Sequence, residues 1–120
     1  MSQQPHILIA DDERSIRLML ETGLTLNGFR VTSARTGREA LEAVSSCQFD
    51  AVLSDVYMPD GNGLDVAREI LTTGAKVRVV FTSGYPIDST ILPVEMRGRV
   101  QILQKPFLPR ALGELLNSPA

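Results

Sequence analysis

The sequence is poor in the features that mark several large classes of protein. It has a single cysteine, Cys47, so no disulfide can form within the chain. Its apolar runs are far shorter than the roughly 20 residues of a transmembrane helix, and the opening residues "MSQQP" lack the charged and apolar regions of a signal peptide. The formal net charge is -2 and no basic run is present, so nothing points to nucleic-acid binding through this chain. We therefore expect a soluble, cytoplasmic protein.

The chain has 120 residues, 43% of them hydrophobic, and we expect residues 1–120 to form one domain with a sizeable core. Short apolar runs alternate with stretches of helical periodicity. The expected strands are residues 6–10, 29–34, 49–54, 77–83 and 100–104. The expected helices are 13–27, one opened by the capping box Thr36–Glu39, 64 to about 73, and a short last helix from Pro109. Prolines and a glycine interrupt 85–99, where a fourth helix is due, so we expect that helix to be short or irregular.

Continuous apolar strands that alternate with helices predict an α/β fold whose parallel sheet is covered on both faces. In such sheets the ligand binds beyond the carboxyl ends of the strands. Polar residues stand at those ends in this chain: Asp11-Asp12, Asp55, Thr82-Ser83-Gly84 and Lys105-Pro106. Three carboxylates brought together repel one another, and Mg²⁺ with its preference for carboxylate, water and phosphate oxygens would relieve that repulsion. The combination suits phosphoryl transfer to a carboxylate nucleophile.

Four motifs in this order resemble the response-regulator receiver domain of two-component signalling over nearly the whole chain. They are "ADDE" (10–13), "DVYMPDGNG" (55–63), "FTSGY" (81–85) and "QKPF" (104–107). Asp55 precedes Ser83 by 28 residues and Lys105 by 50, and the four motifs at this spacing are far more specific than any one alone. The resemblance implies a flavodoxin-like doubly wound sheet of five parallel strands in the order 2-1-3-4-5. "FTSGY" is similar to receivers attached to hybrid histidine kinases.

The resemblance also implies roles for the residues at the strand ends. Asp55 would take a phosphoryl group from the phosphohistidine of a histidine kinase or a histidine phosphotransferase protein. Mg²⁺, or Mn²⁺, would bind to Asp12, Asp55 and the backbone carbonyl of Tyr57, with Asp11 acting mainly through water. Ser83 would hydrogen-bond the phosphoryl group and Lys105 would pair with it, supported by Thr82, Gly84 and a cis bond before Pro106. Such a domain assists its own phosphorylation and slow dephosphorylation and is otherwise not an enzyme.

Several of these residues have an alternative interpretation. An aspartate at a strand end is often only a cap, and Asp11 and Asp12 could cap the helix that follows them, with Asp12 serving both roles. Lys105 could be a solvated surface lysine. Thr82 competes with Ser83 for the hydroxyl role; we favour Ser83 because successive strand residues face opposite sides and because its 22-residue spacing to Lys105 fits the family. His6, alone at a strand start, fits a core or rim histidine better than a ligand.

Two other functions use related residues. A haloacid-dehalogenase-type phosphatase also combines an aspartate nucleophile, Mg²⁺, a hydroxyl and a lysine. That family has an Asp-x-Asp motif after the first strand and a cap domain, whereas this chain has Asp11-Asp12 there and is too short for a cap domain. A pseudo-receiver would bind a partner without taking phosphate, and the full set of acceptor residues argues against it.

Three further expectations concern partners, output and lifetime. Helical spacing would make Ile16 and Met19 core residues, whereas the resemblance implies that they are partly exposed and pack on the helical bundle that carries the donor histidine. Ile102 stands where the family commonly has a tyrosine or phenylalanine that acts as a switch. Tyr57 and Tyr85 stand two residues after the acceptor and two after the hydroxyl residue, and we expect their rings to shield an aspartyl phosphate from water.

Overall fold

The structure is a computed structural model that describes residues 4–56, 58, 63–72, 77–84, 94, 100–105, 110, 111 and 114. Within these residues, five strands and three helices alternate along the chain. Their bounds are β1 His6–Ala10, α1 Arg14–Leu26, β2 Arg30–Ala34, α2 Gly37–Ser46, β3 Ala51–Asp55, α3 Gly63–Thr72, β4 Arg78–Ser83 and β5 Val100–Gln104. The strand predictions were therefore right to within two residues at each end.

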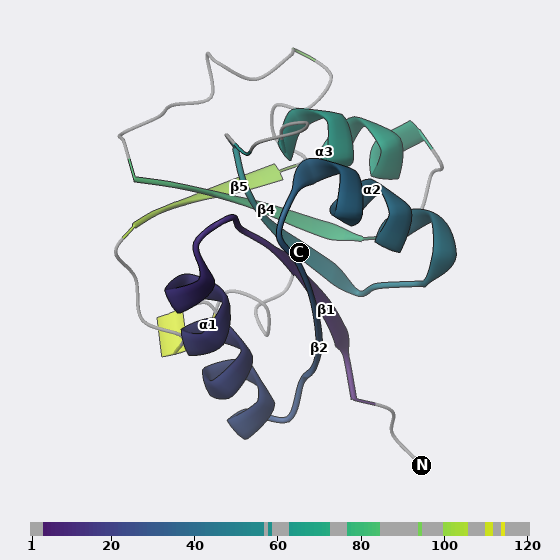
Figure 1. The fold of residues 1–120 in the computed structure, drawn as a ribbon. Coiled ribbons are helices and arrows are strands. Elements are labelled where there is room, and N and C mark those ends of the chain that lie inside the picture. The colour runs from purple at the N-terminus through teal and green to yellow at the C-terminus, as the bar shows by residue number, and fades with distance from the viewer. Residues whose placement is uncertain are drawn as a thin grey trace.

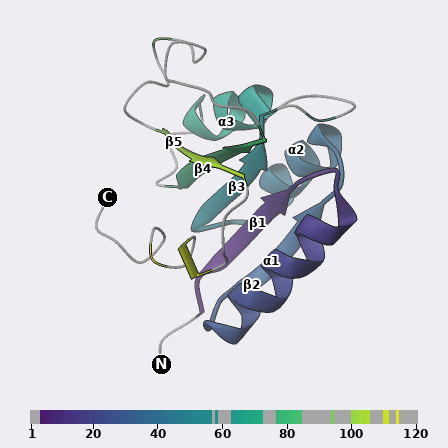
Figure 2. The ribbon, with the colours of Figure 1, turned by 90° about the vertical axis from the view of Figure 1, so that its left-hand side faces the viewer.

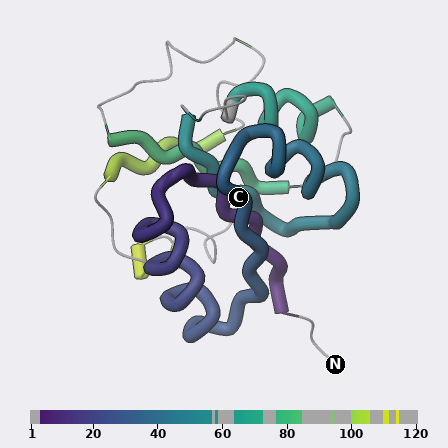
Figure 3. Tube along the Cα trace, viewed as in Figure 1, coloured from purple at the N-terminus to yellow at the C-terminus, as the bar shows by residue number. Residues whose placement is uncertain are grey.

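All five strands pair in parallel in the order β2-β1-β3-β4-β5, which confirms the predicted flavodoxin-like sheet. Helix α1 covers one face of the sheet, and α2 and α3 lie together on the other (Figures 1 and 2). The chain therefore crosses from β1 to β2 on one side and from β2 to β3 on the other, a path that Figure 3 lets the reader follow as a tube. The strand order reverses between β1 and β3, which is where such folds bind ligands.

Each face of the sheet has its own apolar cluster, and alternation along the strands assigns residues to one or the other. Leu8, Val52, Val79 and Phe81 face α2 and α3. The residues that alternate with them face α1: Ile7, Ile9, Leu53 and Val80, with Leu20 and Leu24 of the helix packed against them. Strands β1, β3 and β4 are buried along nearly their whole length and are largely apolar, as their sequence indicated, whereas the edge strands β2 and β5 are partly exposed.

Helix α1 ends where its sequence predicts an end. Gly28 has a φ of 91°, a conformation that glycine adopts without the strain of a Cβ atom. The N–H of Gly28 donates to the carbonyl of Thr25, and the N–H of Phe29 donates to the carbonyl of Leu24. These two bonds make a Schellman motif, and the buried side chains of Phe29 and Leu24 belong to the same apolar cluster. The motif turns the chain sharply from α1 into β2.

Helix α2 begins with a cap that is close to the predicted capping box. The Thr36 hydroxyl accepts a hydrogen bond from the N–H of Glu39 at 3.1 Å, as predicted. The Glu39 carboxylate reaches back, but it accepts from the N–H of Arg35, one residue before the cap, at 2.9 Å. The Glu39 carboxylate also pairs with the Arg35 guanidinium at 3.1 Å, and this ion pair accounts for its position beside Arg35 instead of beside the N–H of Thr36. Together these bonds with Arg35 keep the pKa of Glu39 below its usual value.

Two sequence expectations lie mainly outside the described residues. The short or irregular fourth helix over 85–99 is one, since only Val94 of that stretch is described. The last helix from Pro109 is the other, although the three described residues there, 110, 111 and 114, are all helical. Among the described residues, no helix has both the length and the apolar character to cross a membrane.

Candidate functional site

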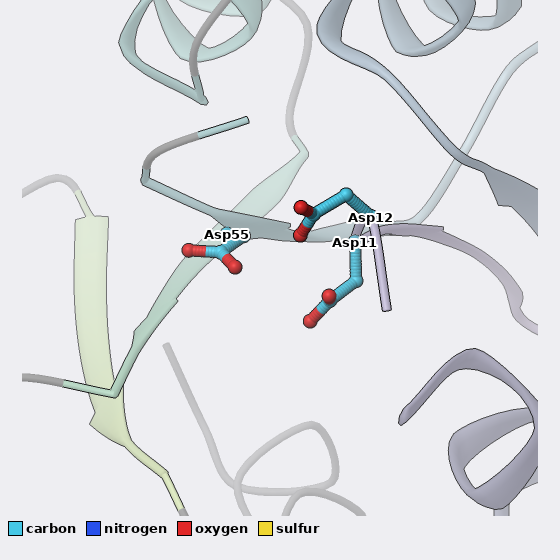
Figure 4. A group of neighbouring side chains, drawn as sticks. All are labelled: Asp11, Asp12 and Asp55. Atoms are coloured by element: carbon cyan, nitrogen blue, oxygen red, sulfur yellow. The ribbon is translucent and has the colours of Figure 1, made fainter. Parts of the chain in front are cut away.

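Three carboxylates meet at the carboxyl ends of the two central strands. Asp11 and Asp12 follow β1, and Asp55 is the last residue of β3. These strands are neighbours, and the last pair in their register is Ala10 with Ser54. Oxygen atoms of Asp11, Asp12 and Asp55 consequently lie within 4.8 Å of one another (Figure 4). At an effective dielectric constant near 20, two charges at that distance repel by about 3 kcal/mol.

Asp11 is buried and forms hydrogen bonds through both its backbone and its carboxylate. Only 2% of the residue is exposed. One carboxylate oxygen, Oδ1, accepts from the N–H of Glu13 at 2.9 Å, and the backbone carbonyl accepts from the Arg17 guanidinium at 2.8 Å. The N–H of Asp11 donates to the carbonyl of Ala34 on β2. These bonds fix the direction of the second oxygen, Oδ2, which faces Lys105.

The capping interpretation of this aspartate pair is only partly right. The N-cap residue of α1 is Glu13, and its side chain makes no capping hydrogen bond. The carboxylate of Asp11 accepts the Glu13 N–H at the entrance to the helix. Asp12 is exposed, and its carboxylate belongs to the cluster with Asp55.

Lys105 closes the cluster with a positive charge. Its ammonium lies 2.9 Å from Asp11 Oδ2 and 3.0 Å from Asp55 Oδ2, and its side chain is 12% exposed. The backbone N–H of Lys105 donates a hydrogen bond of 2.7 Å to the carbonyl of Ser83 on β4, and this bond fixes the position of Lys105 after β5. Lys105 is therefore not a solvated surface lysine. Burial by itself would lower its pKa and is the largest single influence, but the hydrogen bonds and charges of Asp11 and Asp55 together outweigh burial, so the pKa of Lys105 lies above its usual value.

The register of β3 with β4 bears on the choice between the two hydroxyl residues. Asp55 pairs with Thr82, and Leu53 pairs with Val80 two residues earlier. Leu53 and Val80 both face α1, so alternation gives Asp55 and Thr82 that same face and gives Ser83 the face of Phe81. Alternation therefore favours Thr82, and the prediction of Ser83 now depends on its spacing to Lys105. Both residues are buried.

The two predicted docking residues lie in the first half of α1, the helix that follows Asp11 and Asp12. Ile16 is half-buried and packs against the apolar cluster under α1, while Met19 is 38% exposed. Both are thus partly exposed, as expected. Sequence reasoning missed Leu18, which is more exposed than Met19. It also assigned no role to Glu13, although this residue closes the quoted motif "ADDE" and its carboxylate lies 3.7 Å from the Lys105 ammonium.

The remaining predicted residues are Tyr57, Tyr85, Pro106, Gly84 and His6. Tyr57, Tyr85 and Pro106 lie outside the described residues, so the Tyr57 carbonyl, the shielding rings and the cis bond remain predictions. At Gly84, an added Cβ would meet none of the described residues within 4 Å. His6 lies at the start of β1, at the end of the strand away from the carboxylates. Its Nε2 lies 2.7 Å from the Thr32 hydroxyl, and its ring packs on Phe49 with 4.5 Å between the ring centres. These contacts agree with the prediction of a rim histidine.

The fold and the cluster together define a class of protein. A doubly wound sheet whose switch point carries crowded carboxylates, one ammonium and buried hydroxyls is suited to binding a hard cation and a phosphoryl group. Among the described residues, the groups that converge there as possible metal ligands are all carboxylates, which favours Mg²⁺ or Mn²⁺ over metals that prefer nitrogen or sulfur.

Comparison with known proteins narrows this class to one family. The model of the response regulator receiver domain matches residues 7–117. Response regulator MprA of Mycolicibacterium vanbaalenii is 39% identical over 111 residues, which cover 92% of this chain and 46% of that protein. Chemotaxis protein CheY of Thermotoga maritima is 31% identical over 112 residues, covering 92% of this chain and 93% of the relative. The structure of CheY4 from Vibrio cholerae matches with a TM-score of 0.83 at 28% identity, over 94% of this chain and 96% of that one.

The chain belongs to the response regulator receiver domain family. Its function is that of a receiver domain in two-component signalling, which accepts a phosphoryl group on an aspartate. The family is one of signalling domains and not of enzymes in the ordinary sense. The chain spans less than half the length of MprA but nearly all of CheY.

Proposed function

We propose that Asp55 is the phosphoacceptor of this receiver domain, which we take to comprise residues 1–120, and that the donor is the phosphohistidine of a histidine kinase or a histidine phosphotransferase protein. One observation carries the proposal. Among the three clustered carboxylates, Asp55 is the one that combines a position at the end of a central strand, slight exposure to solvent (9%) and an ammonium at 3.0 Å. An incoming phosphoryl group can reach it, and its charge is opposed by Lys105.

The reaction is a transfer between two nucleophiles. An oxygen of Asp55 forms a bond to phosphorus while the bond from phosphorus to the donor's imidazole nitrogen breaks, and that nitrogen keeps the bonding pair. Lys105, already beside Asp55 Oδ2, pairs with the phosphoryl oxygens as their charge arrives. A hydroxyl of Ser83, or of Thr82 beside Asp55 in the register, donates to another phosphoryl oxygen.

The carboxylates fit a divalent cation. Asp12 and Asp55 would bind Mg²⁺ or Mn²⁺ directly, Asp11 would act mainly through water, and the family resemblance adds the backbone carbonyl of Tyr57. When bound, the cation neutralises charge on the cluster and on the phosphoryl oxygens. The observation that supports this fit is that one oxygen of each of the three carboxylates lies within 4.8 Å of the others, while the Lys105 ammonium contacts only Asp11 and Asp55 of the cluster.

Asp12 provides the simplest test of the metal site. Asp12→Asn removes one anionic oxygen, so it should weaken Mg²⁺ binding and, because it also relieves repulsion, raise the stability of the metal-free protein by up to about 1 kcal/mol. Thermal melts of both proteins with and without Mg²⁺ measure this. An equal Mg²⁺ effect in parent and variant would exclude Asp12 as a ligand.

The function itself is tested with Mg²⁺ and a small phosphodonor such as acetyl phosphate. The proposal requires one labile adduct per chain, formed only with the divalent cation. Continuous phosphate release with turnover would instead indicate a phosphatase, and the absence of any adduct would indicate a pseudo-receiver.

We also infer where the partner docks and what sets the lifetime of the adduct. The partner's helical bundle would pack on Ile16 and Met19, which lie in the first half of α1, the helix that follows Asp11 and Asp12. Tyr57 and Tyr85 would exclude water from the phosphoryl group. Faster dephosphorylation of Tyr57→Ala and Tyr85→Ala than of the parent would support this, and unchanged rates in both and in the double variant would refute it.

A further inference from the structure

Glu13 contacts the site in two ways, and neither belongs to the mechanism described so far. Its backbone N–H donates to Asp11 Oδ1 at 2.9 Å, and its carboxylate Oε1 lies 3.7 Å from the Lys105 ammonium. Its side chain is 59% exposed. An ion pair so long and so exposed contributes almost nothing to stability in this state.

The position of the Lys105 ammonium conflicts with that of a bound cation. The ammonium lies between Asp11 Oδ2 and Asp55 Oδ2, at 2.9 and 3.0 Å. A divalent cation on the same cluster would use oxygens of Asp55 and Asp12, and one oxygen of each of the three carboxylates lies within 4.8 Å of the others. Two cations this close repel, and the divalent one binds the carboxylates more strongly. Lys105 must then give up at least part of its contact with Asp55.

An ammonium that leaves these carboxylates needs another anion. Lys105 is half-buried, and its displacement toward an apolar surface would be costly. Among the described residues, the remaining carboxylate within 4 Å of its Nζ is that of Glu13. A rotation of the two flexible side chains would bring them into direct contact, and the bond from the Glu13 N–H to Asp11 keeps the Glu13 backbone in place meanwhile.

We propose that Glu13 is a positioning residue that receives the Lys105 ammonium when a divalent cation enters the carboxylate cluster. Lys105 is thereby held over the site, ready for the phosphoryl group, instead of moving into solvent. The inference rests on the metal site proposed above. It predicts that the interaction between Glu13 and Lys105 is negligible without metal and substantial with it.

A double-mutant cycle in urea unfolding tests this without reference to phosphorylation. The parent, Glu13→Gln, Lys105→Met and the double variant are unfolded with and without saturating Mg²⁺. Any direct attraction between Glu13 and the cation is present with either residue at position 105, so it cancels in the cycle. The coupling in the unfolding constant should be less than about twofold without Mg²⁺ and should rise to about fivefold or more with it.

Glu21→Gln gives the matched control, because it removes the same charge from the same helix two turns away. Its coupling to Lys105→Met should stay below about twofold with and without Mg²⁺. If the coupling of Glu13 to Lys105 is the same in both conditions, the proposal is overturned. If Mg²⁺ does not stabilise even the parent protein, the metal site itself is refuted, and that result is distinct from the first.

A second measurement needs no substitution of Lys105. The chain has two lysines, Lys76 and Lys105, so protein labelled with ¹³C at the lysine ε-carbons gives two signals. Saturating Mg²⁺ should shift the Lys105 signal in the parent and leave it distinct from that of a free lysine. In Glu13→Gln the same addition should move it to the free-lysine position. Identical Mg²⁺-saturated signals in parent and variant would contradict the role of Glu13.

Discussion

Strand β3 has an aspartate at each end, and the two differ in their exposure and in the groups that surround their carboxylates. Asp50, just before the strand, is exposed, and its carboxylate accepts the N–H of His6 at 2.7 Å. Its own N–H donates to the carbonyl of His6, and its carbonyl accepts from Arg78. Asp50 therefore joins the amino ends of three neighbouring strands, β1, β3 and β4.

Asp55, at the other end, has neighbours that serve a different purpose. Its carboxylate lies beside those of Asp11 and Asp12 and is paired with Lys105 at 3.0 Å. The contacts of Asp50 satisfy a backbone donor, whereas those of Asp55 bring like charges together. The comparison teaches that the neighbours, and not the strand end, decide whether an aspartate is structural or functional.

The sharpest way to break this comparison is to exchange each aspartate for asparagine. Asp55→Asn removes the nucleophile, so phosphorylation by acetyl phosphate should fall below detection. Asp50→Asn keeps an oxygen that can accept the His6 N–H, so it should retain phosphorylation at a rate within about twofold of the parent, because the surface change is small. Intact-protein mass spectrometry measures both. Loss of the adduct in Asp50→Asn, in a variant that remains folded, would show that the two ends are not separate in function.

The next largest effect should come from the hydroxyl beside Asp55. If Ser83 is the donor, Ser83→Ala should slow phosphorylation by about 10- to 100-fold, as expected for one hydrogen bond to transition-state charge, and Thr82→Val should have little effect. The β3–β4 register predicts the opposite result. Initial rates with a small phosphodonor at fixed Mg²⁺ decide between the two residues. Equal loss in both variants would mean that neither hydroxyl acts alone.

A smaller effect, seen only with a protein partner, should separate the two ends of α1. Ile16→Ala should slow transfer from the phosphorylated partner by about tenfold, consistent with 1–2 kcal/mol for a truncated interface residue, and leave the reaction with acetyl phosphate unchanged. Leu26→Ala is the control, since Leu26 is an exposed apolar residue at the far end of the same helix. Equal slowing with both donors would point to damage in the fold or the site.

The ion pairs of Lys105 should stabilise the metal-free protein against unfolding. Lys105→Met leaves two largely buried carboxylates without their shared cation and should lower the free energy of unfolding by about 1–3 kcal/mol at neutral pH. The pKa of Lys105 is raised in the folded protein, so its contribution is complete below the unfolded-state value of about 10.4 and is lost as pH rises through the folded-state pKa. Urea unfolding from pH 7 to 11 should give a difference between parent and variant that is constant up to about pH 10 and shrinks above it. A difference that already disappears near pH 8 would contradict the raised pKa.

The sequence predicted the sheet well because its signals are local. Apolar runs define β1 and β4, Gly28 ends α1, and Thr36 starts α2, and each depends on residues close in the chain. The cluster of Asp11, Asp12, Asp55 and Lys105 was also predictable, because parallel strands bring their carboxyl ends to one edge.

What the sequence did not reveal depends on register and on side-chain reach. The pairing of Asp55 with Thr82 follows from how β3 and β4 align, which no local pattern specifies. The approach of Glu13 to Lys105 joins residues 92 positions apart at a helix entrance, and the quoted motif gave no reason to expect it. The place of Asp50 as a backbone acceptor for His6 was missed for the same reason, since it joins β1 to β3 across 44 positions.

The identity of the phosphorylated residue tests the central claim most directly. The protein is phosphorylated with acetyl phosphate and Mg²⁺, the acyl phosphate is reduced with borohydride, and the modified residue is located by peptide mass spectrometry. Reduction converts a phosphorylated aspartate to homoserine, so the site is marked permanently. We predict homoserine at position 55 alone. Homoserine at position 11, 12 or 50, or no conversion in a protein that binds Mg²⁺, would contradict the assignment of Asp55 as the phosphoacceptor.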